Sequence, residues 1–146
     1  MSVRLLSLLF TLTASGCNGP FLVIPGGGLD GEAEPAPSDW SFAGDYGTVQ
    51  LETRAEDPYS VNIAFTVIEG HLYVNAGGTQ TQWVKNMEAS PLVRLRMNGA
   101  LYELRAERVT SAVEIASFGE AWTNQSMFRR DPSKLDEVWV YRLIPR

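Results

Sequence analysis

Val93-Arg-Leu-Arg-Met-Asn-Gly-Ala-Leu-Tyr-Glu-Leu104 is the stretch that decides the fold, because it holds two alternating runs joined by Asn98-Gly99. Asn-Gly is typical of a two-residue type I′ turn, since both residues accept a positive φ. Such a turn sets Arg94 opposite Glu103, a favourable cross-strand charge pair. It also places six apolar side chains on the other face of the hairpin, in three pairs: Met97 with Ala100, Leu95 with Tyr102, and Val93 with Leu104.

Four more strands are predicted outward from this hairpin. Alternating or β-branched runs bounded by turn residues indicate strands at residues 48–54, 60–68, 71–76 and 137–144. The first places Val49, Leu51 and Thr53 on one face, and Glu69-Gly70 turns the second into the third. The last is apolar on both faces, so we expect it to be covered on both sides.

Two helices punctuate the strands. Thr79–Ala89 follows Gly77-Gly78 and carries Trp83 and Met87 four residues apart, a spacing that buries one stripe. Ser111 and Glu114 form a capping-box pattern that opens a second helix to about Trp122. The sequence therefore predicts a mainly β fold, a small barrel of about six strands with two short helices.

The polar segment 124–136 is predicted as a loop. Its Arg129-Arg130 pair, followed by Asp131, is expected to be solvated, with a partner-binding patch as the alternative. The tryptophans are most simply core residues: Trp40, Trp122 and Trp139.

The N-terminus indicates export. Arg4 precedes the apolar run 5–14, which is too short to span a bilayer, where a helix needs about 20 apolar residues. The ending Ala14-Ser15-Gly16-Cys17 resembles the lipobox of bacterial lipoproteins. This resemblance implies cleavage after residue 16 and lipidation of Cys17 by chains such as palmitate. Since Asn18 follows in place of Asp, it implies the outer membrane rather than the inner one. The alternative is an ordinary signal peptide followed by an unrelated cysteine.

The predicted organisation is a signal peptide at 1–16, a Gly/Pro-rich acidic tether at 17–38 and one barrel domain at 39–146. Within the tether, Phe21–Ile24 is too apolar to be left in water without reason, so it either packs on the domain or extends from the membrane. Pro25–Gly28 lacks the Gly-Lys-Ser/Thr ending of a phosphate-binding loop.

Composition excludes several functions. Arg4 is the only charged residue before Cys17, so the net charge of −5 becomes −6 after cleavage, which disfavours nucleic-acid binding. With Cys17 lipidated, no free cysteine and one histidine remain, which argues against structural zinc, a thiol nucleophile and disulfides. His71 follows a turn and is expected on the surface, and no metal site is predicted.

The region 70–109 resembles the split β-barrel flavoproteins, a superfamily that includes pyridoxamine 5′-phosphate oxidases and deazaflavin-dependent nitroreductases. The resemblance rests on a turn into a Leu-Tyr-Val strand, a Gly-Gly pair, a Trp-x-x-Asn-Met helix, and a proline before the next strand: Gly70, Leu72, Tyr73, Val74, Gly77, Gly78, Trp83, Asn86, Met87, Pro91 and Val93. It covers most of residues 48–146.

The resemblance implies a barrel that binds FMN or a deazaflavin, often at a homodimer interface, with the cofactor phosphate near two places. The first is the turn between the first two strands, with Arg54, Ser60 and Asn62. The second is the segment before the Trp helix, with Gly77, Gly78, Thr79 and Gln80. A strand, two glycines and a helix start independently suit an anion there, because free N–H groups and the positive helix end converge.

The sequence also departs from the nitroreductase pattern. At the first place a basic Gly-Arg-Lys-x-Gly loop is replaced by a turn that retains Arg54 but adds Glu56 and Asp57. The base expected before the Gly-Gly pair is Asn75 or Ala76 here. Each lost charge-assisted contact weakens anion binding by roughly 1.5–3 kcal/mol.

Two functions follow, and the catalytic residues, if any, are not predicted. The favoured hypothesis is a membrane-anchored extracytoplasmic lipoprotein whose barrel is a non-catalytic binding module for a small molecule or a partner. The alternative is a flavin- or deazaflavin-dependent oxidoreductase, in which the cofactor carries the hydride chemistry. A hydrolase using His71 with Glu56 or Asp57 has the least support, because neighbouring carboxylates in a turn point apart.

Overall fold

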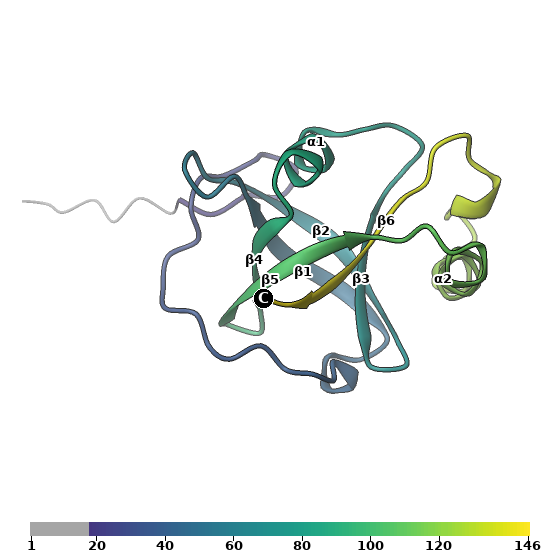
Figure 1. Ribbon diagram of the computed structural model, residues 1–146, viewed down its shortest axis with the longest axis horizontal. Helices are drawn as coiled ribbons and strands as arrows, with labels where there is room; N and C mark the ends of the chain where they lie inside the picture. The colour runs from purple at the N-terminus through teal and green to yellow at the C-terminus, as the bar shows by residue number, and fades with distance from the viewer. Residues whose placement is uncertain (1–17) are drawn as a thin grey trace, which may run out of the picture.

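A computed structural model describes residues 18–146; the predicted signal peptide 1–16 and the predicted lipidation site Cys17 lie outside the described residues. Six antiparallel strands close into a barrel in the order β1-β2-β3-β6-β5-β4 (Figure 1). The strands are β1 (Tyr46–Thr53), β2 (Tyr59–Ile68), β3 (His71–Ala76), β4 (Leu92–Met97), β5 (Ala100–Arg108) and β6 (Trp139–Pro145). Two helices, α1 (Gln82–Ala89) and α2 (Ala112–Asn124), and two 3₁₀ turns, η1 (Ser41–Ala43) and η2 (Pro132–Lys134), complete the described elements.

The predicted fold class is confirmed, and so is the register of the β4–β5 hairpin. Asn98 has φ 51° and Gly99 φ 84°, the positive values that a type I′ turn requires. Arg94 lies opposite Glu103 in the ladder, as predicted, but the expected ion pair is wrong. Arg94 instead pairs with Glu52, and Glu103 pairs with Arg146. The reason is that β4 also pairs with β1, where Glu52 is the register partner of Arg94.

Helix α1 lies across one mouth of the barrel (Figure 1), and its apolar stripe closes the main core. Trp83 and Met87 are buried, as predicted, together with Val84. The helix begins at Gln82 rather than at residue 79, because Thr81 stays extended at the N-cap position. The described core includes Trp40 and Trp139, as predicted.

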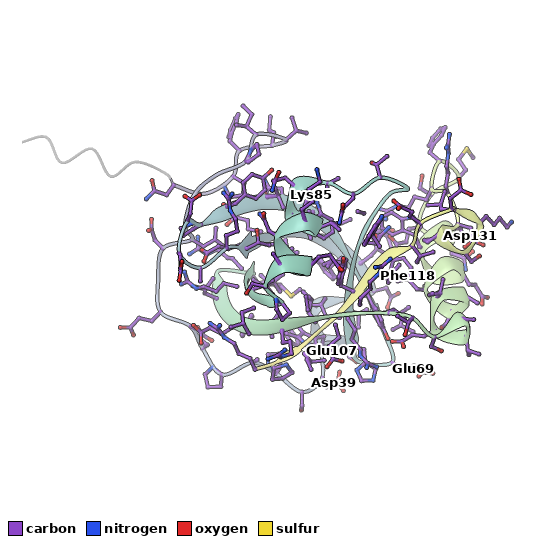
Figure 2. The ribbon with its side chains drawn as sticks, turned by 45° about the horizontal axis from the view of Figure 1, so that its top comes forward. Asp39, Glu69, Lys85, Glu107, Phe118 and Asp131 are labelled. Atoms are coloured by element: carbon purple, nitrogen blue, oxygen red, sulfur yellow. The ribbon has the colours of Figure 1, made fainter. Side chains whose placement is uncertain are left out.

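Helix α2 packs against the outside of β3 and β6 through a second apolar cluster. Phe118 of α2 is fully buried there, against Tyr73 and Val140 (Figure 2). Ser111 caps the helix, as predicted, by accepting a hydrogen bond from the N–H of Glu114. The reciprocal half of the capping box is not formed, because the Glu114 carboxylate binds Tyr73 and Arg142. Because α2 covers its outer face, β6 is buried on both sides over Trp139–Tyr141, as its sequence predicts.

Residues 18–38 lie along the barrel instead of forming a free tether (Figure 1). Gly26 forms an antiparallel bridge with Ser60 of β2, and Glu34 forms a parallel bridge with Tyr102 of β5. Leu29 is 2% exposed. The apolar run Phe21–Ile24 does not pack inward, whereas the glycine-rich residues after it do, because bare backbone can approach a strand closely.

Within residues 18–146, no helix is both long and apolar enough to cross a lipid bilayer.

Candidate functional site

The first predicted phosphate position, the β1–β2 turn, is committed to contacts within the chain. Arg54 Nη2 lies 3.3 Å from Asp57 Oδ2, and the Arg54 guanidinium lies 5.3 Å from the centre of the Tyr59 ring. The acid that replaces a base in the predicted pattern therefore neutralises the one arginine that remains.

The other two donors of this position bind the N-terminal segment. Ser60 Oγ donates to the carbonyl of Gly27 at 2.7 Å. Asn62 Nδ2 donates to the carbonyls of Leu22 and Pro20, at 3.0 and 3.3 Å. The hydrogen-bond donors predicted to hold a phosphate are thus bound to backbone carbonyls, and Ser60 is fully buried beneath this segment.

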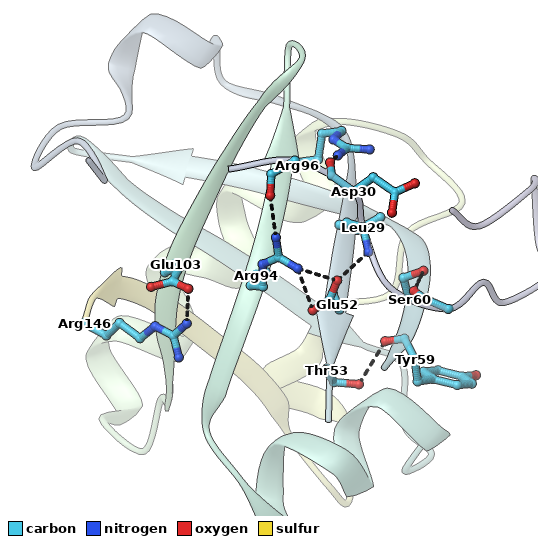
Figure 3. A network of polar contacts seen from close by, with 12 residues as sticks. Leu29, Asp30, Glu52, Thr53, Tyr59, Ser60, Arg94, Arg96, Glu103 and Arg146 are labelled. Atoms are coloured by element: carbon cyan, nitrogen blue, oxygen red, sulfur yellow. Dashed lines mark hydrogen bonds and ion pairs between the residues drawn. The ribbon is translucent and has the colours of Figure 1, made fainter. Parts of the chain in front are cut away.

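A buried carboxylate of β1 holds the same segment (Figure 3). Glu52 is 3% exposed and accepts hydrogen bonds from the N–H of Leu29 at 2.5 Å and from Arg94 at 3.2 and 3.3 Å. Arg94 also donates to the carbonyl of Gly31, and Arg96 to that of Asp30. Alternation along β1 does not reveal this burial, because the segment that covers Glu52 is distant in sequence.

The second predicted position borders an open cavity of about 580 Å³. Gly77, Gly78 and Thr79 line one side of it, as predicted, whereas Gln80 is not among its lining residues. The opposite wall comes from the end of α2 and the following loop, and the full lining is Asn75, Ala76, Gly77, Gly78, Thr79, Trp122, Phe128, Arg129, Arg130, Pro132 and Leu135. Trp122 is thus partly exposed in a cavity wall, while it also packs against the second apolar cluster beside Phe118, so its predicted core role is met only in part.

Two polar atoms in this lining are buried without a hydrogen-bond partner: Arg129 Nη1 and Asn75 Oδ1. The Arg129 guanidinium lies 3.5 Å from the centre of the Trp122 ring. Burial lowers the pKa of Arg129, yet no carboxylate is paired with this arginine among the described residues. Unpartnered buried polar groups are uncommon in folded proteins, and both atoms are covered by protein rather than open to the cavity.

The rim of the cavity is basic. Arg130 is exposed, and Arg129, Arg130 and Lys134 also line an adjoining hollow of about 480 Å³. The one nearby acid, Asp131, is engaged by Ser133, whose N–H and hydroxyl donate to it at 2.9 and 2.7 Å. These hydrogen bonds hold the pKa of Asp131 below its usual value. The loop after α2 thus supplies positive side chains to a cavity where the residues directly before Gly77 supply none.

Neither glycine of the Gly-Gly pair is required by the fold. Gly77 and Gly78 have no positive φ, a Cβ added to Gly77 would meet nothing within 4 Å, and one added to Gly78 would make an ordinary contact with Leu135. Their effect is to leave this wall of the cavity bare. The predicted helix N-terminus does not contribute, since α1 begins four residues after Gly78.

A third polar cluster has the residue types of an acid–base site, but its carboxylates are held in ion pairs. Tyr73 donates to Glu114 at 2.7 Å, and Arg142 forms ion pairs with Glu114 and Glu107. Burial, reinforced by Glu114, raises the pKa of Tyr73 to about 12, so this phenol is neutral at pH 7. His71 lines the same hollow and is exposed, as predicted. Within residues 18–146, no three His, Cys, Asp or Glu side chains gather as a metal site needs.

No protein-family model and no curated protein matches this sequence. Among solved structures, the chain is similar to a putative pyridoxamine 5′-phosphate oxidase from Listeria innocua. The identity is 17%, the match covers 68% of this chain and 83% of that chain, and the TM-score is 0.49. The chain folds as a closed barrel of six antiparallel strands with two helices, an architecture that follows from its own strand order. The similarity says nothing about activity.

Proposed function

We propose that the protein is a lipid-anchored extracytoplasmic binding module that holds a small anionic ligand in the cavity between Gly77–Thr79 and Arg129-Arg130. The anchor is Cys17, on the strength of the lipobox-like sequence. The ligand has a carboxylate or phosphate group for the arginines and a planar or apolar part for Trp122 and Leu135.

The observation that carries this proposal is the position of Arg129 and Arg130, which line one open cavity opposite Gly77–Thr79 and have no carboxylate partner among the described residues. A ligand that bears an anionic oxygen would pair with these arginines. Charge-assisted hydrogen bonds to a guanidinium are about twice as strong as neutral ones, so the anionic group would dominate affinity.

The redox alternative implies a flavin phosphate near the β1–β2 turn or near Gly77–Thr79, and the residues at the turn do not fit one. Arg54 is paired with Asp57, while Ser60 and Asn62 donate to backbone carbonyls of residues 20–27. A phosphate at this position would have to displace the N-terminal segment. A flavin bound by its phosphate beside Arg129-Arg130 remains compatible with the proposal, as a ligand.

Isothermal titration of residues 18–146, which contain the whole closed barrel, tests the ligand class. The probes are FMN, riboflavin, which has the same ring system without phosphate, and inorganic phosphate. We expect FMN to bind at least tenfold more tightly than riboflavin. We expect Arg130→Gln to weaken FMN binding about tenfold, because one charge-assisted contact contributes roughly 1.5–3 kcal/mol.

Arg54→Ala is the matched control, since it removes an arginine from the first position. Unchanged affinity in this variant supports the cavity. Affinity that is lost in Arg54→Ala and kept in Arg130→Gln would return the site to the β1–β2 turn. Mass spectrometry of the full chain and of Cys17→Ser, each recovered from bacterial membranes, tests the anchor separately.

A further inference from the structure

The N-terminal segment carries a tight apolar hairpin that projects from the barrel. Phe21, Leu22, Val23 and Ile24 are 69%, 70%, 95% and 61% exposed. Four consecutive large apolar side chains in water are costly, at roughly 1.5–3 kcal/mol for each side chain that could be buried. Contiguous exposed apolar surface of this kind marks an interaction site.

This hairpin is held in a defined position. Phe21 and Ile24 exchange backbone hydrogen bonds of 3.0 and 2.8 Å, and Leu22 adopts φ 51° at the turn. Asn62 fixes the Leu22 carbonyl, and the bridge between Gly26 and Ser60 ties the following residues to β2. The apolar tip is therefore presented by the fold, with little ordering left to occur on binding.

Its backbone is also suited to an apolar surrounding. The N–H and C=O groups of Phe21 and Ile24 satisfy one another, and the Leu22 carbonyl is paired with Asn62. Pro20 and Pro25 flank the hairpin and have no N–H to desolvate. Unsatisfied backbone groups are the main obstacle to placing non-helical chain in lipid, and few remain here.

Charge and position identify the partner. Residues 18–29 contain no charged side chain, so the hairpin enters an apolar phase without burying an ion. Asn18, the residue after Cys17, already accepts a hydrogen bond from the N–H of Gly27 at 2.7 Å. In the sequence, Cys17 directly precedes this docked residue and stands four residues before Phe21.

We propose that Phe21–Ile24 inserts into the lipid bilayer as a second membrane contact beside the Cys17 anchor and holds the barrel at the membrane surface. The inference rests on the proposed lipid anchor for the choice of partner. Lipid on Cys17 anchors only the end of the chain, whereas a second apolar contact would also hold the barrel against the membrane. Since the processed chain carries a charge of −6, neutral lipid is favoured over anionic lipid.

The first test places an environment-sensitive fluorophore on Val23→Cys in the lipidated full chain, reconstituted in phosphatidylcholine vesicles. The matched control is Val113→Cys on α2, where the native valine is 81% exposed. We expect blue-shifted emission at position 23, quenched by brominated lipids, and water-like emission at position 113. Water-like emission at both positions with Cys17 lipidated overturns the hairpin insertion and leaves the anchor standing.

The second test needs no lipid on the protein. The chain from residue 17 with Cys17→Ser contains the closed barrel, its core and both helices, and its partitioning into phosphatidylcholine vesicles is measured by flotation. Phe21→Ser combined with Leu22→Asn should lower the partition coefficient tenfold or more, while Val113→Ser should leave it unchanged. Asparagine is used because it tolerates the positive φ of position 22.

The two proposals fail separately. If mass spectrometry finds Cys17 unmodified while the hairpin variant loses vesicle binding, the insertion stands and the anchor is wrong. If sedimentation velocity shows a dimer that the hairpin variant converts to a monomer, a second copy of the chain covers the hairpin and the bilayer inference is overturned.

Discussion

The buried carboxylate of Glu52 accepts a hydrogen bond from the backbone N–H of Leu29, 23 residues earlier in the chain (Figure 3). This contact joins the N-terminal segment to the barrel wall where β1 pairs with β4. Arg94 of β4, the register partner of Glu52, forms an ion pair with the same carboxylate. The segment that covers the first predicted phosphate position is therefore part of the fold, and it also positions the exposed hairpin.

Glu52→Gln should destabilise the protein by about 1.5–3 kcal/mol, because a charge-assisted hydrogen bond is lost and Arg94 is left without its partner. Urea denaturation measures the change. Glu103→Gln breaks a more exposed pair with Arg146 and should cost less than about 1 kcal/mol. Equal effects from the two substitutions would contradict the role assigned to Glu52.

Gly26→Ala should detach residues 18–31 from β2. An added Cβ would lie 2.3 Å from the Gly19 carbonyl carbon and 2.5 Å from the Asn18 oxygen, and backbone atoms cannot yield that far. Hydrogen exchange at the Ser60 N–H, which donates to Gly26, should accelerate.

Gly27→Ala is the control for this substitution, because its Cβ would make only an ordinary 3.8 Å contact with Asn18. Its effect on stability should stay within about 0.5 kcal/mol. Rapid exchange in both variants would mean that the segment is not docked as described.

Gly77→Val should weaken binding of an anionic probe to the cavity at least tenfold without lowering thermal stability. Its side chain would enter the bare wall of the cavity, and its Cβ meets no atom within 4 Å in the folded chain. Parallel titration and thermal denaturation check both halves of the prediction. Unchanged FMN affinity would exclude this wall from the binding site.

Alkaline pH should weaken the fold through Tyr73. Burial raises the pKa of Tyr73 to about 12, against about 10 in an unfolded chain. Because the pKa is raised in the folded chain, the stabilisation that neutral Tyr73 gives the fold is complete below about pH 10 and is lost as the pH rises toward 12. Denaturation at a series of pH values should show a shallower alkaline decline for Tyr73→Phe than for the native chain. Tyr46→Phe removes a phenol that is 54% exposed and should leave the decline unchanged.

Local chemistry made the hairpin of residues 93–104 predictable. Its Asn-Gly turn, its alternation and its loop length all depend on neighbours within a dozen residues, and the observed register is the predicted one. The charge pairing failed for a related reason. Each strand of a closed barrel has two neighbours. Arg94 of β4 pairs with Glu52 of β1, a strand that lies outside the hairpin.

The candidate site was half predictable. Gly77, Gly78 and Thr79 were identified from the strand–glycine–helix pattern, and they do line a cavity. Arg129-Arg130 was assigned to a solvated loop, because no pattern in the sequence relates residue 129 to residue 77. The two meet only because α2 packs on β3 and β6 and directs the following loop back over the end of β3.

By itself the sequence determined the strands, the two helices, the hairpin register and the barrel class, since these depend on periodicity and turn chemistry between near neighbours. Only the tertiary structure decided that residues 18–31 cover the first phosphate position, that Phe21–Ile24 faces outward, and that Arg129 reaches the Gly-Gly wall. The physical reason is that burial and pairing of a polar group depend on which distant segment lies over it. The fold of the whole chain decides which segment that is, and the type of the covered residue does not.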